Sequence, residues 1–375
     1  MISVLVVDDS VVIRRLITDA LADDPQIRVV GTAPNGRVAL TKIAQLRPDL
    51  VTLDVEMPVL DGLATLRELR RTDRLTPVIM FSTLTVAGAH ATFDALAAGA
   101  SDYVTKPSNV GSITESLRMV REQLVPRIHA LCEWRMRRTA PAPVRPTRPV
   151  GPPPAATRPV TPTPATRGGR TDRVDVLAVG CSTGGPDALS QVLKALPGTL
   201  PVPVVVVQHM PPVFTKMFAE RLHRTAALHV VEAVTDTPLS PGTVYIAPGD
   251  FHLEVARAGT NVVTRVHSGP PENFCRPAVD VLFRSVAKTY GGNVLALVLT
   301  GMGQDGRRGC EPLAAAGAGA EIVVQDEATS VVWGMPGAVA QAGLADAVLP
   351  LPEIASHLIT RTARGRGARA MEVTR

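Results

Sequence analysis

The sequence predicts two α/β domains, each a doubly wound parallel sheet with helices on both faces, joined by a proline-rich linker. Three observations support this fold class. Short apolar runs alternate with helix-length segments, the longest runs end in polar or glycine-rich turns, and residues 139–170 hold ten prolines. Near-continuous apolar runs are typical of parallel strands buried on both faces. The 375 residues suffice for two domains of ordinary size.

The first segment predicts five strand–helix units. Apolar residues at helical spacing predict helices over Val11–Leu21 and Leu63–Arg71. Short apolar runs between such segments predict strands. These strands are Ser3–Val7, Arg28–Gly31, Leu50–Leu53, Val78–Phe81 and Asp102–Val104.

The second segment repeats the pattern. Its predicted parallel strands are Val174–Val179, Val202–Val207, Val294–Leu299 and Glu321–Gln325. The stretch Thr243–Val266 alternates more and predicts a hairpin. Proline fixes φ and removes a backbone donor, so the proline-rich part predicts an extended linker. We expect a first domain over 1–125, a linker over 126–171, a second domain over 172–358 and a disordered basic tail over 359–375.

The net charge of +5 is unevenly distributed. Residues 134–171 carry +8 and residues 361–375 carry +4, which leaves −7 on the remainder. The parts expected to fold are therefore acidic, and no helix-turn-helix pattern is found. A nucleic-acid enzyme more often carries its positive charge on a folded face, so we expect no nucleic-acid partner.

The sequence also favours a cytoplasmic protein that is not embedded in a membrane. No apolar run approaches the roughly 18 to 20 residues that a membrane helix needs. Asp8 and Asp9 stand where a signal peptide carries basic residues. The four cysteines are far apart and form no C-x-x-C, which favours neither a disulfide framework nor a zinc knuckle.

Polar residues follow the predicted strands of the first segment. Asp8 and Asp9 follow the first strand, Asp54 the third and Lys106 the fifth, while Ser82 ends the fourth. The carboxyl ends of parallel strands share one edge, where such folds bind ligands. Converging carboxylates repel one another, and a divalent cation such as Mg²⁺ relieves that repulsion. The alternative for Asp8 and Asp9 alone is that they cap the next helix.

A second group follows the strands of the second segment. Ser182 lies in a glycine-rich turn between a strand and a helix, His209 follows the next strand, and Asp305 follows a third. Each residue taken singly has a simpler interpretation. The turn at Ser182 could bind phosphate or only reverse the chain, His209 could be a packed or surface histidine, and Asp305 could be an ordinary turn residue. Together they have the residue types of a nucleophile, its base and the acid that orients the base.

The motifs D-D-S, L-D-V-E-M-P-V-L-D-G, M-F-S-T and Y-V-T-K-P resemble the flavodoxin-like receiver domain of bacterial two-component regulators, over roughly residues 1–125. The resemblance implies that Asp54 accepts a phosphoryl group. It implies that Asp9, Asp54 and the Glu56 carbonyl hold Mg²⁺, with Asp8 acting through water.

The same resemblance implies three switch residues. Ser82 and Lys106 sense the phosphate, and Tyr103 is the aromatic side chain that changes position. Serine replaces the commoner threonine at position 82, which keeps the hydroxyl. A histidine kinase is the implied phosphodonor.

The motifs G-C-S-T-G-G, V-V-V-Q-H-M-P, Y-I-A-P-G-D-F-H, R-P-A-V-D-V-L-F, L-T-G-M-G-Q-D-G and Q-D-E-A-T-S-V-V-W-G-M-P-G resemble the Rossmann-like three-layer catalytic domain of the CheB-type chemotaxis methylesterases, over roughly residues 172–350. The resemblance implies Ser182 as nucleophile, His209 as base, Asp305 as its partner and the Met302 amide as an oxyanion donor. It implies a CheA-type kinase as phosphodonor.

The implied reaction is hydrolysis of glutamate γ-methyl esters, and deamidation of glutamines, on methyl-accepting chemotaxis receptors. Ester hydrolysis needs no cofactor. The resemblance also implies that the unphosphorylated first domain covers the active-site cleft. Three positions depart from the family pattern: Cys181, Cys275 and Arg307. Two alternatives stay open: a non-catalytic binding module controlled by the first domain, and the same esterase in a pathway other than chemotaxis.

Overall fold

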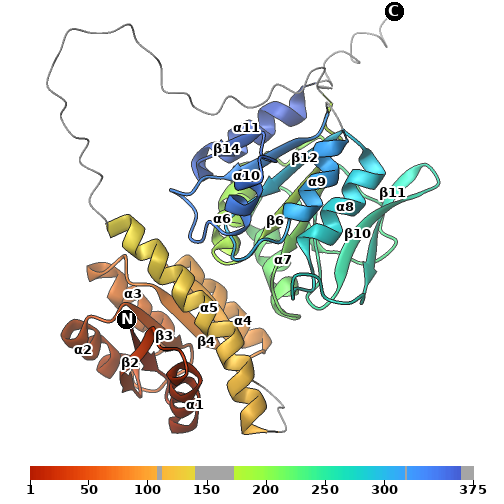
Figure 1. The fold of residues 1–375 in the computed structure, drawn as a ribbon. Coiled ribbons are helices and arrows are strands. Elements are labelled where there is room, and N and C mark those ends of the chain that lie inside the picture. The colour runs from red at the N-terminus through yellow and green to blue at the C-terminus, as the bar shows by residue number, and fades with distance from the viewer. Residues whose placement is uncertain (108–111, 140–172, 317–318, 365–375) are drawn as a thin grey trace, which may run out of the picture.

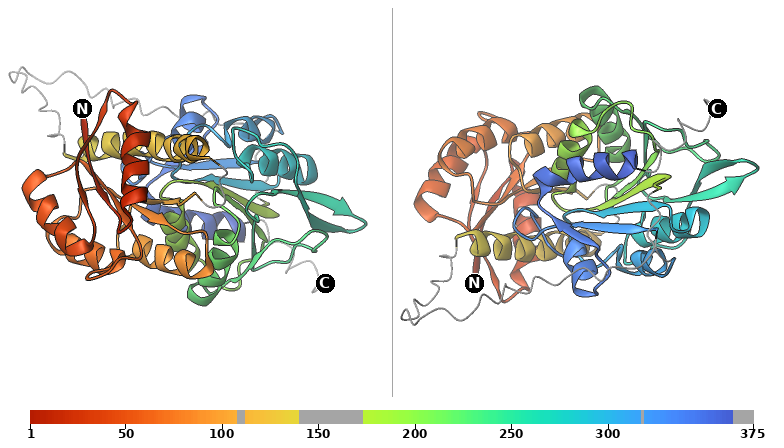
Figure 2. Two further views of the ribbon diagram at one scale, coloured as in Figure 1. Left: turned by 90° about the horizontal axis from the view of Figure 1, so that it is seen from below. Right: turned by 90° about the horizontal axis from the view of Figure 1, so that it is seen from above.

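The computed structural model describes residues 1–107, 112–139, 173–316 and 319–364. It has the predicted fold class: two α/β domains, each with a parallel sheet between layers of helices (Figures 1 and 2). The proline-rich segment predicted as a linker lies outside the described residues from 140 to 172. Within the described part of the chain, no helix is both long and apolar enough to cross a membrane.

The first domain is a five-stranded parallel sheet in the order β2-β1-β3-β4-β5. Strands β3 and β4 are buried along their whole length. All five predicted strands are confirmed. The elements are β1 (Ile2–Val7), α1 (Val11–Ala22), β2 (Ile27–Ala33), α2 (Gly36–Leu46), β3 (Leu50–Asp54), α3 (Gly62–Thr72), β4 (Val78–Ser82), α4 (Val86–Ala97), β5 (Asp102–Thr105) and α5 (Ile113–Thr139).

Polar N-caps begin the first four helices of this domain. Ser10, Asn35, Asp61 and Thr85 each accept a hydrogen bond from a backbone amide in the first turn. Such a cap typically contributes about 1 kcal/mol to helix stability. Because Ser10 caps α1, the alternative that Asp8 and Asp9 serve as that cap is wrong.

The second domain is a seven-stranded parallel sheet in the order β14-β13-β12-β6-β7-β9-β8, with an antiparallel hairpin of β10 and β11 beside it. The four predicted strands are confirmed. The predicted hairpin is confirmed only in its second part, because Thr243–Ile246 is a strand of the parallel sheet. The elements are β6 (Val176–Cys181), α6 (Gly185–Ala195), β7 (Val204–Gln208), α7 (Phe214–Thr225), β8 (His229–Glu232), β9 (Thr243–Ile246), β10 (His252–Ala258), β11 (Asn261–His267), α8 (Val279–Tyr290), β12 (Val294–Val298), α9 (Arg307–Ala315), β13 (Glu321–Gln325), α10 (Met335–Gln341), β14 (Ala347–Leu349) and α11 (Leu351–Ala363).

The boundary predicted at residue 126 is wrong, because α5 continues through Pro126 to Thr139. The helix continues because its inner face still has an apolar surface to cover. Ile128, Leu131 and Cys132 are buried in the same cluster as Ile17 of α1. Burial of such side chains outweighs the cost of one proline within the helix.

The predicted start of the tail at residue 359 is also wrong, because α11 extends to Ala363. Arg361 is 6% exposed and its guanidinium pairs with Glu321 at the start of β13. His357, one turn earlier, lies 2.9 Å from the same carboxylate. The charge of +4 assigned above to residues 361–375 therefore includes Arg361, which belongs to the folded domain.

We expect Arg361→Ala to lower the free energy of unfolding by about 3 kcal/mol, because it leaves the buried Glu321 carboxylate without its main charge partner. Urea unfolding followed by circular dichroism measures this. Arg364→Ala, at an exposed position in the same turn, is the matched control and should stay within about 0.5 kcal/mol of wild type. Equal effects of the two substitutions would contradict a stabilising role for the buried pair.

The two domains meet through α4 and α7. Phe93 of α4 stacks on Phe218, with ring centroids 5.4 Å apart. Tyr103 of β5 stacks on Phe214, with centroids 4.9 Å apart and planes 1° apart. A salt bridge of 2.7 Å joins Arg221 to Asp94 at the rim. The aromatic pairs belong to one apolar cluster that spans both domains.

Candidate functional site

The predicted acid pocket of the first domain forms at the carboxyl edge of the sheet. Asp8, Asp9 and Asp54 each place a carboxylate oxygen within 4.8 Å of the others. Lys106 Nζ lies 2.9 Å from Asp8 Oδ2 and 2.8 Å from Asp54 Oδ2. Glu56 lines the same hollow as Asp9. The structure therefore brings together the predicted carboxylates and the predicted lysine.

Electrostatics make Asp54 the unusual carboxyl of this pocket. Burial raises its pKa, the Lys106 ammonium opposes that, and Asp8 adds repulsion, so that the pKa is about 6. Three closely spaced carboxylates offer only oxygen donors, which fit a hard cation such as Mg²⁺. With that charge bound, the Asp54 carboxylate can act as a nucleophile toward a phosphoryl donor.

The other two predicted switch residues make their contacts with groups other than Asp54. The Ser82 hydroxyl donates to the Gly88 carbonyl at 3.1 Å. The Tyr103 side chain is buried against Phe214 of the second domain. A residue predicted to change position is thus part of the contact between the domains.

The second site begins at Ser182, directly after β6. Its amide donates to the Thr300 carbonyl, and its own carbonyl accepts from the Gly185 amide in the turn that starts α6. Gly184 begins that helix at φ 75°, a left-handed conformation that favours glycine. Gly301 must also be small, because a Cβ there would lie 2.3 Å from Met335 Sδ and 3.0 Å from Ser182 Cβ. The chain beside Ser182 is therefore closely packed.

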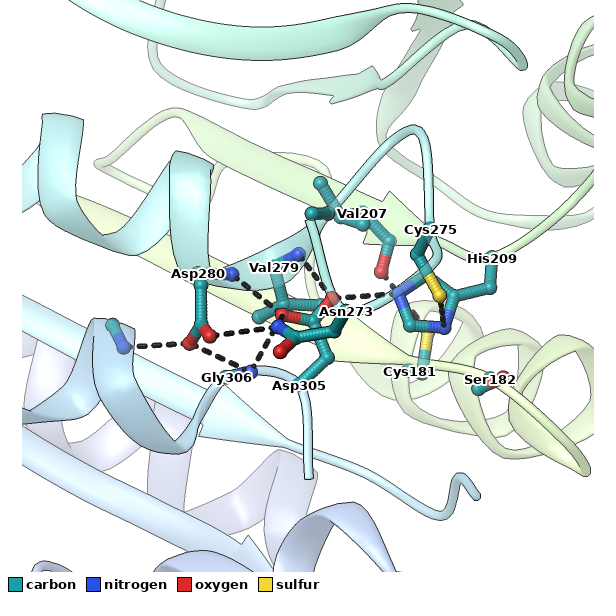
Figure 3. Close-up of polar contacts among 12 residues, drawn as sticks. Cys181, Ser182, Val207, His209, Asn273, Cys275, Val279, Asp280, Asp305 and Gly306 are labelled. Atoms are coloured by element: carbon teal, nitrogen blue, oxygen red, sulfur yellow. Dashed lines mark hydrogen bonds and ion pairs between the residues drawn. The ribbon is translucent and has the colours of Figure 1, made fainter. Parts of the chain in front are cut away.

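His209 and Asp305 form the predicted pair. His209 Nε2 lies 2.8 Å from Asp305 Oδ2, although the residues are 96 positions apart (Figure 3). They follow β7 and β12, which flank the strand of Ser182 in the sheet. Because Nε2 is taken by Asp305, Nδ1 is the nitrogen left for the Ser182 proton. No hydrogen bond joins Ser182 to His209 within the described residues, and Ser182 lies on the side of the ring away from Asp305 (Figure 3).

Asp305 is held as a buried carboxylate. Its oxygens accept from the amides of Val279, Asp280 and Gly306 and from the Asn273 side chain, in addition to His209. Burial raises its pKa, but the hydrogen bonds with His209 and the backbone amides prevail and lower it. The neighbouring Asp280 carboxyl has a raised pKa, because of burial and repulsion by Asp305.

Sequence reasoning missed two residues of this network. Asn273 donates from its amide to both Asp280 and Asp305, at 2.9 Å each. Asp280 also accepts from the amides of Gly306 and Gly309, which fixes the loop after β12. Asp280 lies in the R-P-A-V-D-V-L-F motif, whereas nothing in the sequence around Asn273 marks it.

Cys275, noted above as a departure, lies against the base. Its Sγ is 3.7 Å from His209 Nδ1. Burial lowers the pKa of His209, but hydrogen bonds with Asp305 and Cys275 more than offset that and raise it to about 10. A raised pKa favours the protonated imidazole, which cannot accept the Ser182 proton.

Both domains line the cavity in front of Ser182 and His209, which has a volume of about 340 Å³. Asp102 of the first domain accepts from Thr183 Oγ1 at 2.9 Å and from Arg127 Nε at 3.0 Å. Met302, the predicted oxyanion donor, follows Gly301, and its side chain packs against an apolar cluster that combines first-domain residues with Val332 of the second domain. The first domain thus lines the same cavity as the residues of the second site.

Fold and sites together define a class of protein: a receiver-type domain followed by an α/β domain with a candidate hydrolase site. Known sequence families match both parts. CheB methylesterase matches residues 177–358, and the response regulator receiver domain matches residues 4–118.

Curated relatives match nearly the whole chain. The protein-glutamate methylesterase/protein-glutamine glutaminase of Nocardioides sp. is 56% identical over 97% of this chain and 96% of its own length. The protein of the same name from Trichodesmium erythraeum is 48% identical over 96% and 98%. The crystal structure of the Thermotoga maritima CheB methylesterase catalytic domain is 42% identical and covers 50% of this chain and 98% of that chain, with a TM-score of 0.49. The chain belongs to the protein-glutamate methylesterase/protein-glutamine glutaminase family.

Proposed function

We propose that this protein hydrolyses glutamate γ-methyl esters, and deamidates glutamines, on methyl-accepting chemotaxis receptors. The observation that carries the proposal is the hydrogen-bonded pair of His209 and Asp305, in which His209 lines the same cavity as Ser182. The names of the close relatives support the choice of substrate. A chain acting on the cytoplasmic part of such receptors works in the cytoplasm.

The proposed reaction is acyl transfer through Ser182. His209 takes the hydroxyl proton while Ser182 Oγ bonds to the ester carbon, and the Met302 amide stabilises the resulting oxyanion. The carbon–oxygen bond to the methoxy group then breaks, and His209 returns the proton to form methanol. Water repeats the sequence on the acyl-enzyme and releases glutamate. Asp305 holds the imidazole and stabilises its charged form.

The proposed regulation is removal of the receiver domain from the cavity. A CheA-type histidine kinase supplies the phosphoryl group to Asp54. Asp9, Asp54 and the Glu56 carbonyl, with Asp8 acting through water, would hold Mg²⁺, which would offset the negative charge. Lys106 and the Ser82 hydroxyl then turn to the phosphate oxygens. Movement of Tyr103 with them separates it from Phe214, which weakens the contact between the domains.

Methanol release from membranes that contain methylated receptors tests the proposed reaction. We expect the full chain to release methanol, and to do so faster with Mg²⁺ and a small phosphodonor. Absence of release while Asp54 is shown to be phosphorylated would contradict the esterase and favour a binding module. If methanol were released only from methylated receptors that do not serve chemotaxis, the enzyme would belong to another pathway.

Asp54→Asn is expected to retain the unstimulated rate and lose the acceleration by a phosphodonor, because the amide cannot accept the phosphoryl group. Coupling between two sites of a protein typically changes the affinity at one of them by roughly 5- to 150-fold, and we expect an acceleration of that order in wild type. Methanol release with and without phosphodonor measures the ratio. The matched control is Asp19→Asn, which removes an exposed carboxylate of the same domain. Persistent acceleration in Asp54→Asn would rule out Asp54 as the acceptor.

A further inference from the structure

A thiol and an imidazole face each other at the cavity in a way that the proposed esterase chemistry does not require. Cys275 Sγ lies 3.7 Å from His209 Nδ1, and both residues line the cavity with Ser182. Reciprocal backbone hydrogen bonds between Glu272 and Cys275 close the loop that carries the thiol. The loop is thereby held with the sulfur directed at the ring, as Figure 3 shows.

The separation of the two atoms matches a shared metal ion. Zinc binds thiolate sulfur at about 2.3 Å and imidazole nitrogen at about 2.0–2.1 Å. With a tetrahedral angle between these bonds, nitrogen and sulfur lie about 3.6 Å apart. The observed 3.7 Å between Cys275 Sγ and His209 Nδ1 is close to this separation.

Asp305 completes the arrangement from the far side of the ring. The carboxylate lies 2.8 Å from Nε2 and so keeps a proton on that nitrogen, which leaves Nδ1, the nitrogen beside Cys275, to bind a metal once it has lost its proton. Zinc-binding histidines commonly donate their other nitrogen to a carboxylate in this way. The carboxylate oxygens already accept five N–H donors, which suits an orienting role better than direct coordination.

We infer that Zn²⁺ binds between Cys275 and His209 and inhibits the enzyme. The Cys275 thiol and His209 Nδ1 each release a proton to the solvent, the thiolate sulfur and the Nδ1 lone pair bind the metal, and the Ser182 hydroxyl and cavity water fill the remaining positions. A metal on Nδ1 prevents His209 from accepting the Ser182 proton. The inhibition part of the inference rests on the proposed function, whereas the binding part does not.

The two candidate metal sites found among the described residues differ in donor type, which makes them separable. The pocket of Asp8, Asp9 and Asp54 offers oxygen alone and suits Mg²⁺. Thiolate and imidazole instead favour zinc and similar transition metals. Excess Mg²⁺ therefore occupies the receiver pocket and leaves the Cys275–His209 site available.

Cobalt titration of the full chain in excess Mg²⁺, without phosphodonor, tests binding independently of activity. Thiolate-bound Co²⁺ has a charge-transfer absorption that oxygen-bound Co²⁺ lacks. We expect this band in wild type, its displacement by one equivalent of Zn²⁺, and its loss in Cys275→Ser. Cys132→Ala, which removes a buried thiol of the receiver domain, is the control and should keep the band. No band in wild type, or the same band in Cys275→Ser, would overturn the site.

Methanol release at increasing Zn²⁺ tests inhibition, with each rate divided by the same protein's rate without zinc. We expect Cys275→Ser to need at least about 100-fold more Zn²⁺ for half inhibition, because loss of even an orienting partner costs 10- to 100-fold in affinity. Equal zinc sensitivity of wild type and Cys275→Ser would refute inhibition at this site. If wild type releases no methanol at all, the proposed function fails while the cobalt band still decides the binding site.

Discussion

Replacement of Ser182 by alanine is expected to abolish methanol release, with a loss of about 10⁶-fold in kcat, as serine hydrolases lose on removal of the nucleophile. Alanine keeps the backbone bonds to Thr300 and Gly185 that hold the turn, so the fold should be retained. The loss then comes from the missing nucleophile. Methanol release from methylated receptor membranes, with phosphodonor and Mg²⁺, measures it.

The matched control is Cys181→Ala, one residue away. The Cys181 thiol is fully buried, faces the Val207 carbonyl and has a pKa raised by that burial, so it cannot serve as a thiolate nucleophile. We expect Cys181→Ala to keep most of the activity and to lose a small amount of stability. Methanol release that survives in Ser182→Ala but vanishes in Cys181→Ala would reassign the nucleophile.

Asp305→Asn is expected to lower kcat by about 10⁴-fold, as the corresponding substitution does in serine proteases. Asp305 accepts hydrogen bonds on both oxygens, whereas asparagine would turn an NH₂ group toward one set of N–H donors. If that group faces His209, the ring loses the partner that places its proton on Nε2. The fall should appear in kcat, with KM for methylated receptor little changed.

Asp280→Asn is the comparison that separates orientation from general damage to the loop. It alters the neighbouring carboxyl of the same network, but Asp280 has no bond to His209 in the described structure. Its Oδ1 bonds to Gly306 and Gly309 can be kept by the asparagine oxygen. We expect a much smaller loss of kcat than in Asp305→Asn. Equal losses would indicate that both act only by holding the loop.

Many of the candidate site residues could be predicted because the carboxyl ends of parallel strands follow a simple geometric rule. Each strand ends at the same edge, so a polar residue directly after an apolar run is placed near others of its kind. The rule grouped Asp8, Asp9 and Asp54 in the first domain, and His209 with Asp305 in the second. It cannot say which way a side chain turns, and the Ser82 hydroxyl turns to Gly88 instead of Asp54.

The predicted domain boundaries were wrong where long-range burial of side chains extended a helix into a segment whose local composition is typical of a linker or a tail. Residues 126–139 look like the start of a basic, proline-rich linker, and Arg361 looks like part of a basic tail. Ile128 and Leu131 nevertheless cover an apolar surface of the receiver, and Arg361 pairs with Glu321 inside the second domain. Helices α5 and α11 extend further than predicted because they contact residues far away in the sequence. Local composition gives no information about such long-range contacts.

The sequence by itself determined the two folds, the family and the residues at the strand ends, because these depend on hydrophobic periodicity and local motifs. Only the tertiary structure decided how the domains meet at Tyr103 and Phe214, and which groups surround the base. Cys275 and His209 are 66 residues apart, and Asn273 reaches two carboxylates through a loop that carries no periodic pattern. Such contacts arise from the packing of separate segments, so no spacing along the chain could have predicted them.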